Sequence, residues 1–297
     1  MKHSIGRYGM CMLFILLCFC VVGWSADIAV LIPQAAILAG DDPVNDPLAK
    51  EFTIETLIER GDVGIAWLIN HLEQDLGHTA NIYGTGEDDP GLVEEENDLI
   101  FITEEIGSGS VGRDYRIANK PVIFTESYIL DDMGFTNGQS AFTGGAMTTT
   151  LKVVNSNHPI TRGLPETFVP TINDPATGAP YVVTFGTVTD LGILAGIGDV
   201  LVVMPTSVNE SANGVDLPAD APVVIALEAG STLDAGDKND ARWVFIGYSD
   251  VDPNAAYGGV PEERTLNVLN EHGIRLLDQI IAWALGETVE IDNWNVY

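Results

Sequence analysis

The sequence predicts an α/β fold whose central sheet is mostly parallel, with a strand-rich antiparallel extension in the C-terminal half. The runs "DLIFIT" (98–103) and "KPVIFTE" (120–126) are apolar on both faces, which is typical of parallel strands covered by helices on each side. Beyond Thr150, runs such as "DVLVVMP" and "PVVIALEA" follow one another with few gaps long enough for a helix, which indicates antiparallel strands.

Strands and helices alternate along the N-terminal half. The β-branched run "DIAVLI" (27–32) predicts the first strand, and "ANIYG" (80–84) predicts a short second strand. Between them, apolar residues at helical spacing predict a helix over 62–77, with Asp62 as its N-cap. We expect the acidic segment 87–98 to be a surface connection.

The chain closes with a helix that is capped by Asn270 and ends at Gly286. We expect one domain over 26–288, followed by a tail at 289–297. A content of 46% hydrophobic residues is enough for the core of such a domain.

The first 25 residues have the three-part layout of a secretory signal peptide. Lys2 and Arg7 precede an apolar run from Met10 to Val22, and small residues lead up to a cleavage site after Ser25. The run is short for a membrane span, although an uncleaved signal anchor is the alternative. All three cysteines of the chain lie within this segment: Cys11, Cys18 and Cys20. The mature protein is therefore predicted to be secreted or periplasmic, without disulfides or thiolate nucleophiles.

Acidic residues dominate the charge of the chain. Its 13 Lys and Arg residues face 43 Asp and Glu residues, and removal of the signal would take away two basic side chains and no acidic ones. Such a surface repels phosphate backbones and anionic lipid headgroups, so nucleic-acid binding and membrane association after cleavage are not expected. The simplest reading is solvation of an exported protein.

Several segments, taken in order, carry a resemblance to a known family. They are the strand and loop at 98–111, "KPVIFTES" with "DDMGFT" after it, "NSNHPITRGLP", "ARWVFIGYSD" and the closing "HGIRLLDQIIAWALG". This order resembles the class I glutamine amidotransferase-like superfamily, and in particular its trehalose-utilisation-like branch. The resemblance covers most of the mature chain and implies a flavodoxin-like three-layer sandwich. It does not by itself imply an activity.

In the amidotransferases that the chain resembles, the loop after the third strand holds a catalytic cysteine. The matching position here is occupied by Thr103, Glu104 and Glu105, and the mature chain has no cysteine, so we expect no glutaminase activity. Ser108 and Ser110 in "GSGS" lack the spacing of a nucleophile elbow and an obvious base, and we interpret this segment as a flexible turn.

Three acids follow the two central strands and form the main candidate site. Ligands of an open parallel sheet gather outside the carboxyl ends of its strands, where Glu104, Glu105 and Glu126 are expected. Two neighbouring carboxylates can act as general acid and base, or can hold a hard cation. The alternative is that one of them caps the following helix while the others are solvated.

His158 is the fourth candidate, because its loop corresponds to one near strand ends in the resembling family. It precedes Pro159, which favours an extended backbone and a plain turn, and no other metal ligands cluster around it. The segments 234–240 and 249–259 are rich in oxygen ligands but lack the register of a calcium loop. We therefore assign no metal ligands from the sequence, leave divalent-cation binding by these acidic loops as an open alternative, and predict no cofactor.

Two functions remain open at this stage. The first is an exported, non-catalytic amidotransferase-like domain that acts as a binding or accessory module, linked to carbohydrate metabolism. The second is a hydrolase acting on a sugar or another small polar molecule through Glu104, Glu105, Glu126 and His158. We favour the first, because no complete catalytic constellation is visible in the sequence.

The signal-peptide interpretation is tested by the mass of the exported protein. We expect a mature N-terminus at Ala26, because small residues precede that bond and charged and apolar regions precede them in turn. Mass spectrometry of the secreted or periplasmic fraction measures this directly. A retained Met1 in that fraction would show that the segment is not removed.

Overall fold

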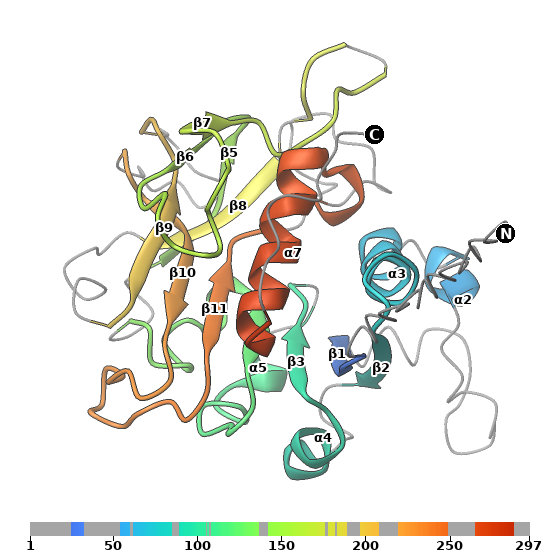
Figure 1. Cartoon of the computed structure of the whole chain (residues 1–297), viewed down its shortest axis with the longest axis vertical. Helices are drawn as coiled ribbons and strands as arrows, with labels where there is room; N and C mark the ends of the chain where they lie inside the picture. The colour runs from blue at the N-terminus through green and yellow to red at the C-terminus, as the bar shows by residue number, and fades with distance from the viewer. Residues whose placement is uncertain are drawn as a thin grey trace, which may run out of the picture.

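The computed structural model describes residues 25–32, 54–59, 62–84, 89–104, 106, 108–136, 142–175, 178–181, 183–188, 197–207, 219–248 and 265–287. Within them lies a nine-stranded sheet with the order β2-β1-β3-β4-β11-β10-β9-β6-β7 (Figure 1). In that order the strands span Thr79–Gly84, Asp27–Ile32, Leu99–Ile102, Val122–Phe124, Trp243–Ile246, Pro222–Leu227, Asp199–Val203, Leu151–Val153 and Thr167–Phe168.

The sheet is divided into a parallel half and an antiparallel half. The strands β2, β1, β3, β4 and β11 are joined by four parallel pairings. The strands β11, β10, β9, β6 and β7 are joined by four antiparallel pairings. The predicted α/β class and the antiparallel C-terminal extension are confirmed, but the sheet is mixed in equal parts rather than mostly parallel. The prediction was wrong on this balance because short strands such as β7 are hard to recognise in the sequence.

A separate two-stranded antiparallel sheet is formed by β5 (Phe142–Thr148) and β8 (Val183–Val188). Both strands lie beside η2 (Ser127–Ile129), the short 3-10 turn that follows β4. This places the small sheet close to the carboxyl end of β4.

The first predicted helix is present but changes its winding. It begins as α3 (Val63–Asn70) and continues as the π-helical turn η1 (His71–Asp75). Asp62 precedes α3 as expected, although its side chain makes no capping hydrogen bond. A short helix, α2 (Ile54–Glu59), packs against α3.

The acidic segment after β2 was predicted to be a surface connection, and the structure shows that it contains the helix α4 (Pro90–Glu96). Asp89 caps this helix by accepting a hydrogen bond from the Gly91 amide at 2.9 Å. Pro90 fits the first helical position because its missing N–H would have no partner there. Val93 is the only buried residue of this helix, which is too weak a periodic signal for prediction.

The closing helix is α7 (Glu271–Leu285), and its predicted ends are confirmed. The Asn270 side chain accepts hydrogen bonds from the amides of His272 and Gly273 at 2.9 and 3.2 Å. Gly286 ends the helix with a left-handed backbone, at a φ of 76°. The nearby 3-10 turn η4 (Leu266–Val268) leads into it.

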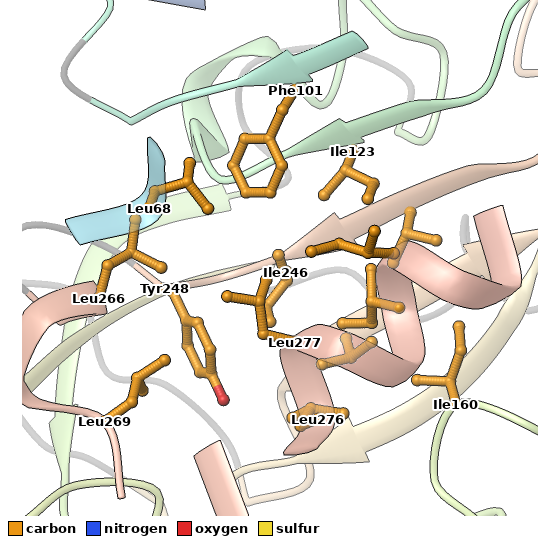
Figure 2. Close-up of a cluster of buried hydrophobic side chains, with 14 of the residues drawn as sticks. Leu68, Phe101, Ile123, Ile160, Ile246, Tyr248, Leu266, Leu269, Leu276 and Leu277 are labelled. Carbon is orange, nitrogen blue, oxygen red and sulfur yellow. The ribbon is translucent and has the colours of Figure 1, made fainter. Parts of the chain in front are cut away.

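The central strands bury both of their faces, because alternate residues belong to two separate hydrophobic clusters. On one face, Phe101 and Ile123 pack with Leu277 of α7, as Figure 2 shows. On the other face, Phe124 contacts Phe135 and belongs to a cluster that includes buried residues of α4 and η2. Among the described residues, no helix is long and apolar enough to cross a membrane.

Gly273 lies where α7 closely approaches Pro170 and Leu269. A Cβ atom at this position would contact the backbone oxygen of Pro170, and would lie 2.8 Å from the Leu269 Cδ2 atom. We expect Gly273→Ala to lower the free energy of unfolding by about 1–3 kcal/mol, because overpacking against backbone outweighs the higher helix propensity of alanine. Urea unfolding measures the change. Gly109→Ala is the matched control, since nothing lies within 4 Å of its Cβ position, and equal losses for both variants would contradict the packing argument.

Candidate functional site

The carboxyl ends of β3 and β4 lie side by side. Ile102 of β3 pairs with Phe124 of β4, and each strand is followed two residues later by a glutamate. This register places Glu104 and Glu126 at the same edge of the sheet. The strand pairing therefore confirms the expected alignment of the two strand ends, and a shared site for the two carboxylates stays a prediction.

Two threonines connect the strands just before these acids. The Thr103 hydroxyl donates a hydrogen bond to the Leu31 carbonyl at 2.8 Å, so it joins β3 to the end of β1. The Thr125 amide donates to the Ile102 carbonyl at 3.0 Å, and thereby joins β4 to β3. Both threonines are buried. The edge is thus fixed by hydrogen bonds between three neighbouring strands.

Glu126 serves the backbone at this edge. Its Oε1 atom accepts a hydrogen bond from the Tyr128 amide at 2.6 Å, which caps the turn η2. The residue is 5% exposed, and Ser127 beside it is buried as well. The sequence allowed either a functional pair of carboxylates or a helix cap. For Glu126 the structure shows the contact of a cap.

The other residues of the predicted site are placed differently. Glu104 lies in the turn after β3 and is partly exposed, whereas Glu105 falls outside the described residues. Ser108 begins the short helix α5 (Ser108–Val111), so the segment predicted to be a flexible turn is helical instead. Ser110 lies in the same helix. A hydrogen bond of 2.8 Å from the Gly112 amide to the Ser108 carbonyl closes this helical turn.

His158 holds a turn together. Its Nδ1 atom accepts a hydrogen bond from the Ile160 amide at 3.2 Å, and its carbonyl oxygen accepts from the amides of Thr161 and Arg162. Burial lowers the pKa of the imidazole, while the nearby carboxylates of Asp199 and Glu228 act in the opposite direction. A neutral ring suits the acceptor role of Nδ1.

The structure does not bring His158 together with Glu126. The imidazole lies against Trp283 of α7, with 5.3 Å between the ring centroids. The Trp283 carbonyl accepts a hydrogen bond from Arg242, which immediately precedes β11, so this contact lies at the amino end of that strand. Glu126 follows the carboxyl end of the parallel neighbour β4. The two residues therefore lie toward opposite ends of the parallel strands.

The acidic loop at 234–240 binds the side chain of Arg116. The buried Arg116 guanidinium donates to Asp234 at 2.6 Å and to Asp237 at 3.0 Å. It also donates to the carbonyl oxygen of Asp132 at 3.1 Å. The hydrogen bonds from Arg116 lower the pKa of Asp237. These carboxylates stabilise the arginine, and the second acidic segment, 249–259, lies outside the described residues.

No group of three or more His, Cys, Asp or Glu side chains in the described part of the chain is arranged to hold a metal ion. One titratable cluster was not predicted from the sequence. His71 of η1 lies between the carboxylates of Asp75 and Asp278. The spacing of His71 and Asp75 by four residues was a signal for a helical pair, but nothing in the sequence pointed to Asp278.

Comparison with solved structures identifies a protein with a similar fold. No sequence-family profile and no curated protein matches the chain. Among solved structures, a ThuA-like protein from Parabacteroides merdae aligns with 90% of this chain and 92% of its own, with a TM-score of 0.51 and 12% identity. A ThuA-like protein from Bacteroides uniformis aligns with 88% of this chain and 94% of its own, with a TM-score of 0.45 and 13% identity. The first comparison shows a shared fold.

The capping contact of Glu126 predicts how substitutions at this position behave. Glu126→Gln keeps an oxygen that can accept from the Tyr128 amide, so we expect little change in stability. Glu126→Ala removes the acceptor and should lower the free energy of unfolding by about 1 kcal/mol. Urea unfolding of both variants distinguishes the effects. Equal stability of the alanine variant and the wild type would show that the cap contributes nothing.

Proposed function

We propose that the protein is an exported, non-catalytic, amidotransferase-like domain that binds a small polar ligand, of which a carbohydrate is the class we favour. The observation that carries this proposal is that β3 is followed by Thr103 and Glu104, at the position where the amidotransferases that the chain resembles have their catalytic cysteine. The threonine hydroxyl is engaged by the Leu31 carbonyl, so it is held as a structural donor. Glu126 on the neighbouring strand caps a turn.

The fold supports the link to the trehalose-utilisation-like branch. The solved ThuA-like structure from P. merdae shares the fold over 90% of this chain. The parallel order β2-β1-β3-β4-β11 corresponds to the 2-1-3-4-5 order of flavodoxin-like sheets, which supports the proposed three-layer arrangement. In such sheets a ligand is expected at the carboxyl ends of the strands, where Glu104 and Glu126 follow β3 and β4.

Composition supports the proposed location outside the cytoplasm and the proposed class of ligand. The net charge of −30 favours neutral or cationic ligands over nucleic acids and anionic membrane surfaces. The N-terminal segment with the layout of a signal peptide supports secretion or transfer to the periplasm.

A hydrolase remains the second candidate, and the strand register is the observation that favours it. Ile102 and Phe124 are paired, so the two glutamates that follow them are neighbours along the edge. Paired carboxylates can act as general acid and base on a glycosidic bond. His158 is not part of this second proposal, since it lies beside Trp283 at the other end of the parallel strands.

The experiment combines a glutaminase assay with calorimetric titration of trehalose and other neutral disaccharides. We expect no ammonia release from glutamine, and saturable binding of at least one disaccharide that is weakened about tenfold or more in Glu104→Gln, since a charged hydrogen bond contributes roughly 1.5–3 kcal/mol. Glu166→Gln is the matched control, because it removes the same charge at an exposed position beside β7.

Each result separates the candidates. Disaccharide hydrolysis that is lost in Glu104→Gln would replace the binding proposal with the hydrolase. Ammonia release from glutamine would overturn both. The absence of both sugar binding and hydrolysis would remove the link to carbohydrates.

A further inference from the structure

His71 connects two helical segments that are far apart in the sequence. Its Nδ1 atom lies 2.7 Å from Asp75 Oδ2, and its Nε2 atom lies 2.6 Å from Asp278 Oδ1. Asp75 belongs to the same π-helical turn, η1, whereas Asp278 lies in α7. The two ring nitrogens thus face carboxylates on opposite sides of the imidazole. The arrangement couples the turn at the end of α3 to the closing helix.

The hydrogen-bond chemistry of this cluster depends on the number of protons on the ring. A neutral imidazole carries one N–H and can donate to only one carboxylate, whereas an imidazolium donates to both. An ionised carboxylate can only accept. Loss of one proton from His71 would therefore leave a nitrogen lone pair facing a carboxylate at hydrogen-bond distance, which is repulsive.

Burial limits the ability of water to replace the lost contact. His71 is 4% exposed and Asp278 is 6% exposed. The second oxygen of Asp278, Oδ2, is buried and has no hydrogen-bond partner among the described residues, so the charge of this carboxylate is balanced mainly by His71. The Asp75 side chain is 63% exposed and reaches solvent.

The surroundings of the ring contain few other charges. Trp67 stacks on the imidazole with a centroid separation of 4.7 Å and an interplanar angle of 12°. The turn η4, which packs against α3, contributes the apolar Leu266 and Val268. In the described part of the chain, Asp75 from its own turn and Asp278 from α7 are the charged groups that act on the ring.

We propose that His71 is a pH-sensitive latch between η1 and α7, which is closed while the ring is doubly protonated and is released when the ring loses a proton. The closed latch has two charge-assisted hydrogen bonds, one to each side of the ring. The released latch retains at most one of them. The inference goes beyond the proposed ligand binding and does not depend on it, since the latch lies in the helical cover of the sheet.

The direction of the titration agrees with this geometry. Burial lowers the pKa of His71, whereas the hydrogen bonds and charges of Asp278 and Asp75 raise it. The two carboxylates together outweigh burial, so the net shift is upward from 6.5. Burial also raises the pKa of Asp278, against the opposing effect of His71. A histidine whose pKa is raised on folding contributes stability that is fully present below its unfolded pKa. That contribution is lost as the pH rises from about 6.5 through the folded pKa.

The first test is a titration of the wild-type protein by long-range ¹H–¹⁵N NMR of the imidazole rings. We expect the titration midpoint of His71 to lie above the ordinary value of about 6.5, with both ring nitrogens protonated below that midpoint. Asp75→Asn, which changes the exposed partner, should lower this midpoint and identify the signal. A midpoint at or below 6.5, or a single N–H on the ring throughout the titration, would overturn the proposal.

The second test is thermal unfolding between pH 5.5 and 9 for the wild type, His71→Gln and the control His272→Gln. His272 is partly exposed and lies 4.0 Å from Glu271. Between pH 6 and 9 we expect the Tm of the wild type to fall by about 2–4 °C more than that of His71→Gln, because only the wild type loses this stabilising proton. His272→Gln should follow the wild type. Parallel profiles for the wild type and His71→Gln would contradict the latch.

Discussion

Burial of β3 and β4 on both faces is the constraint on which the rest of the structure depends. Because alternate residues of both strands belong to two separate hydrophobic clusters, one shared with α7 and the other with α4 and η2, neither strand has a face left for water. Polar side chains are consequently confined to the strand ends. Thr103, Thr125 and Glu126 lie there, and their hydrogen bonds terminate the strands without leaving polar groups in the apolar clusters.

The sequence was most informative where local chemistry decides the structure. The cap at Asn270 and the left-handed Gly286 of α7 could be predicted because each acts through its own backbone neighbourhood. The helix α4 was missed because one buried residue, Val93, does not make a periodic pattern. Strand order and the share of antiparallel pairing depend on contacts between distant segments, which no local pattern records.

The candidate site shows the same limit. Alignment of two strand ends was predictable from the parallel sheet, and the pairing of Ile102 with Phe124 bears it out. The contact of Glu126 with the Tyr128 amide corresponds to the capping alternative for the strand-end acids. The separation of His158 from this edge was not predictable, because it follows from where the loop docks on α7 near Trp283. Likewise, the partnership of His71 with Asp278 spans 207 positions in the chain.

Arg116 illustrates how the few basic residues are used. It pairs with two aspartates, and three other basic side chains of the described part of the chain each pair with one carboxylate: Arg113, Lys152 and Arg242. Acidic side chains outnumber basic ones by 43 to 13 in the whole sequence, so ion pairs cannot neutralise most of the acidic charge. Its neutralisation falls to dissolved counter-ions, so the protein behaves as a compact polyanion. Molecules of the protein repel one another, and the ionic strength of the medium sets the range of this repulsion. The spacing between molecules in a concentrated solution therefore depends on salt.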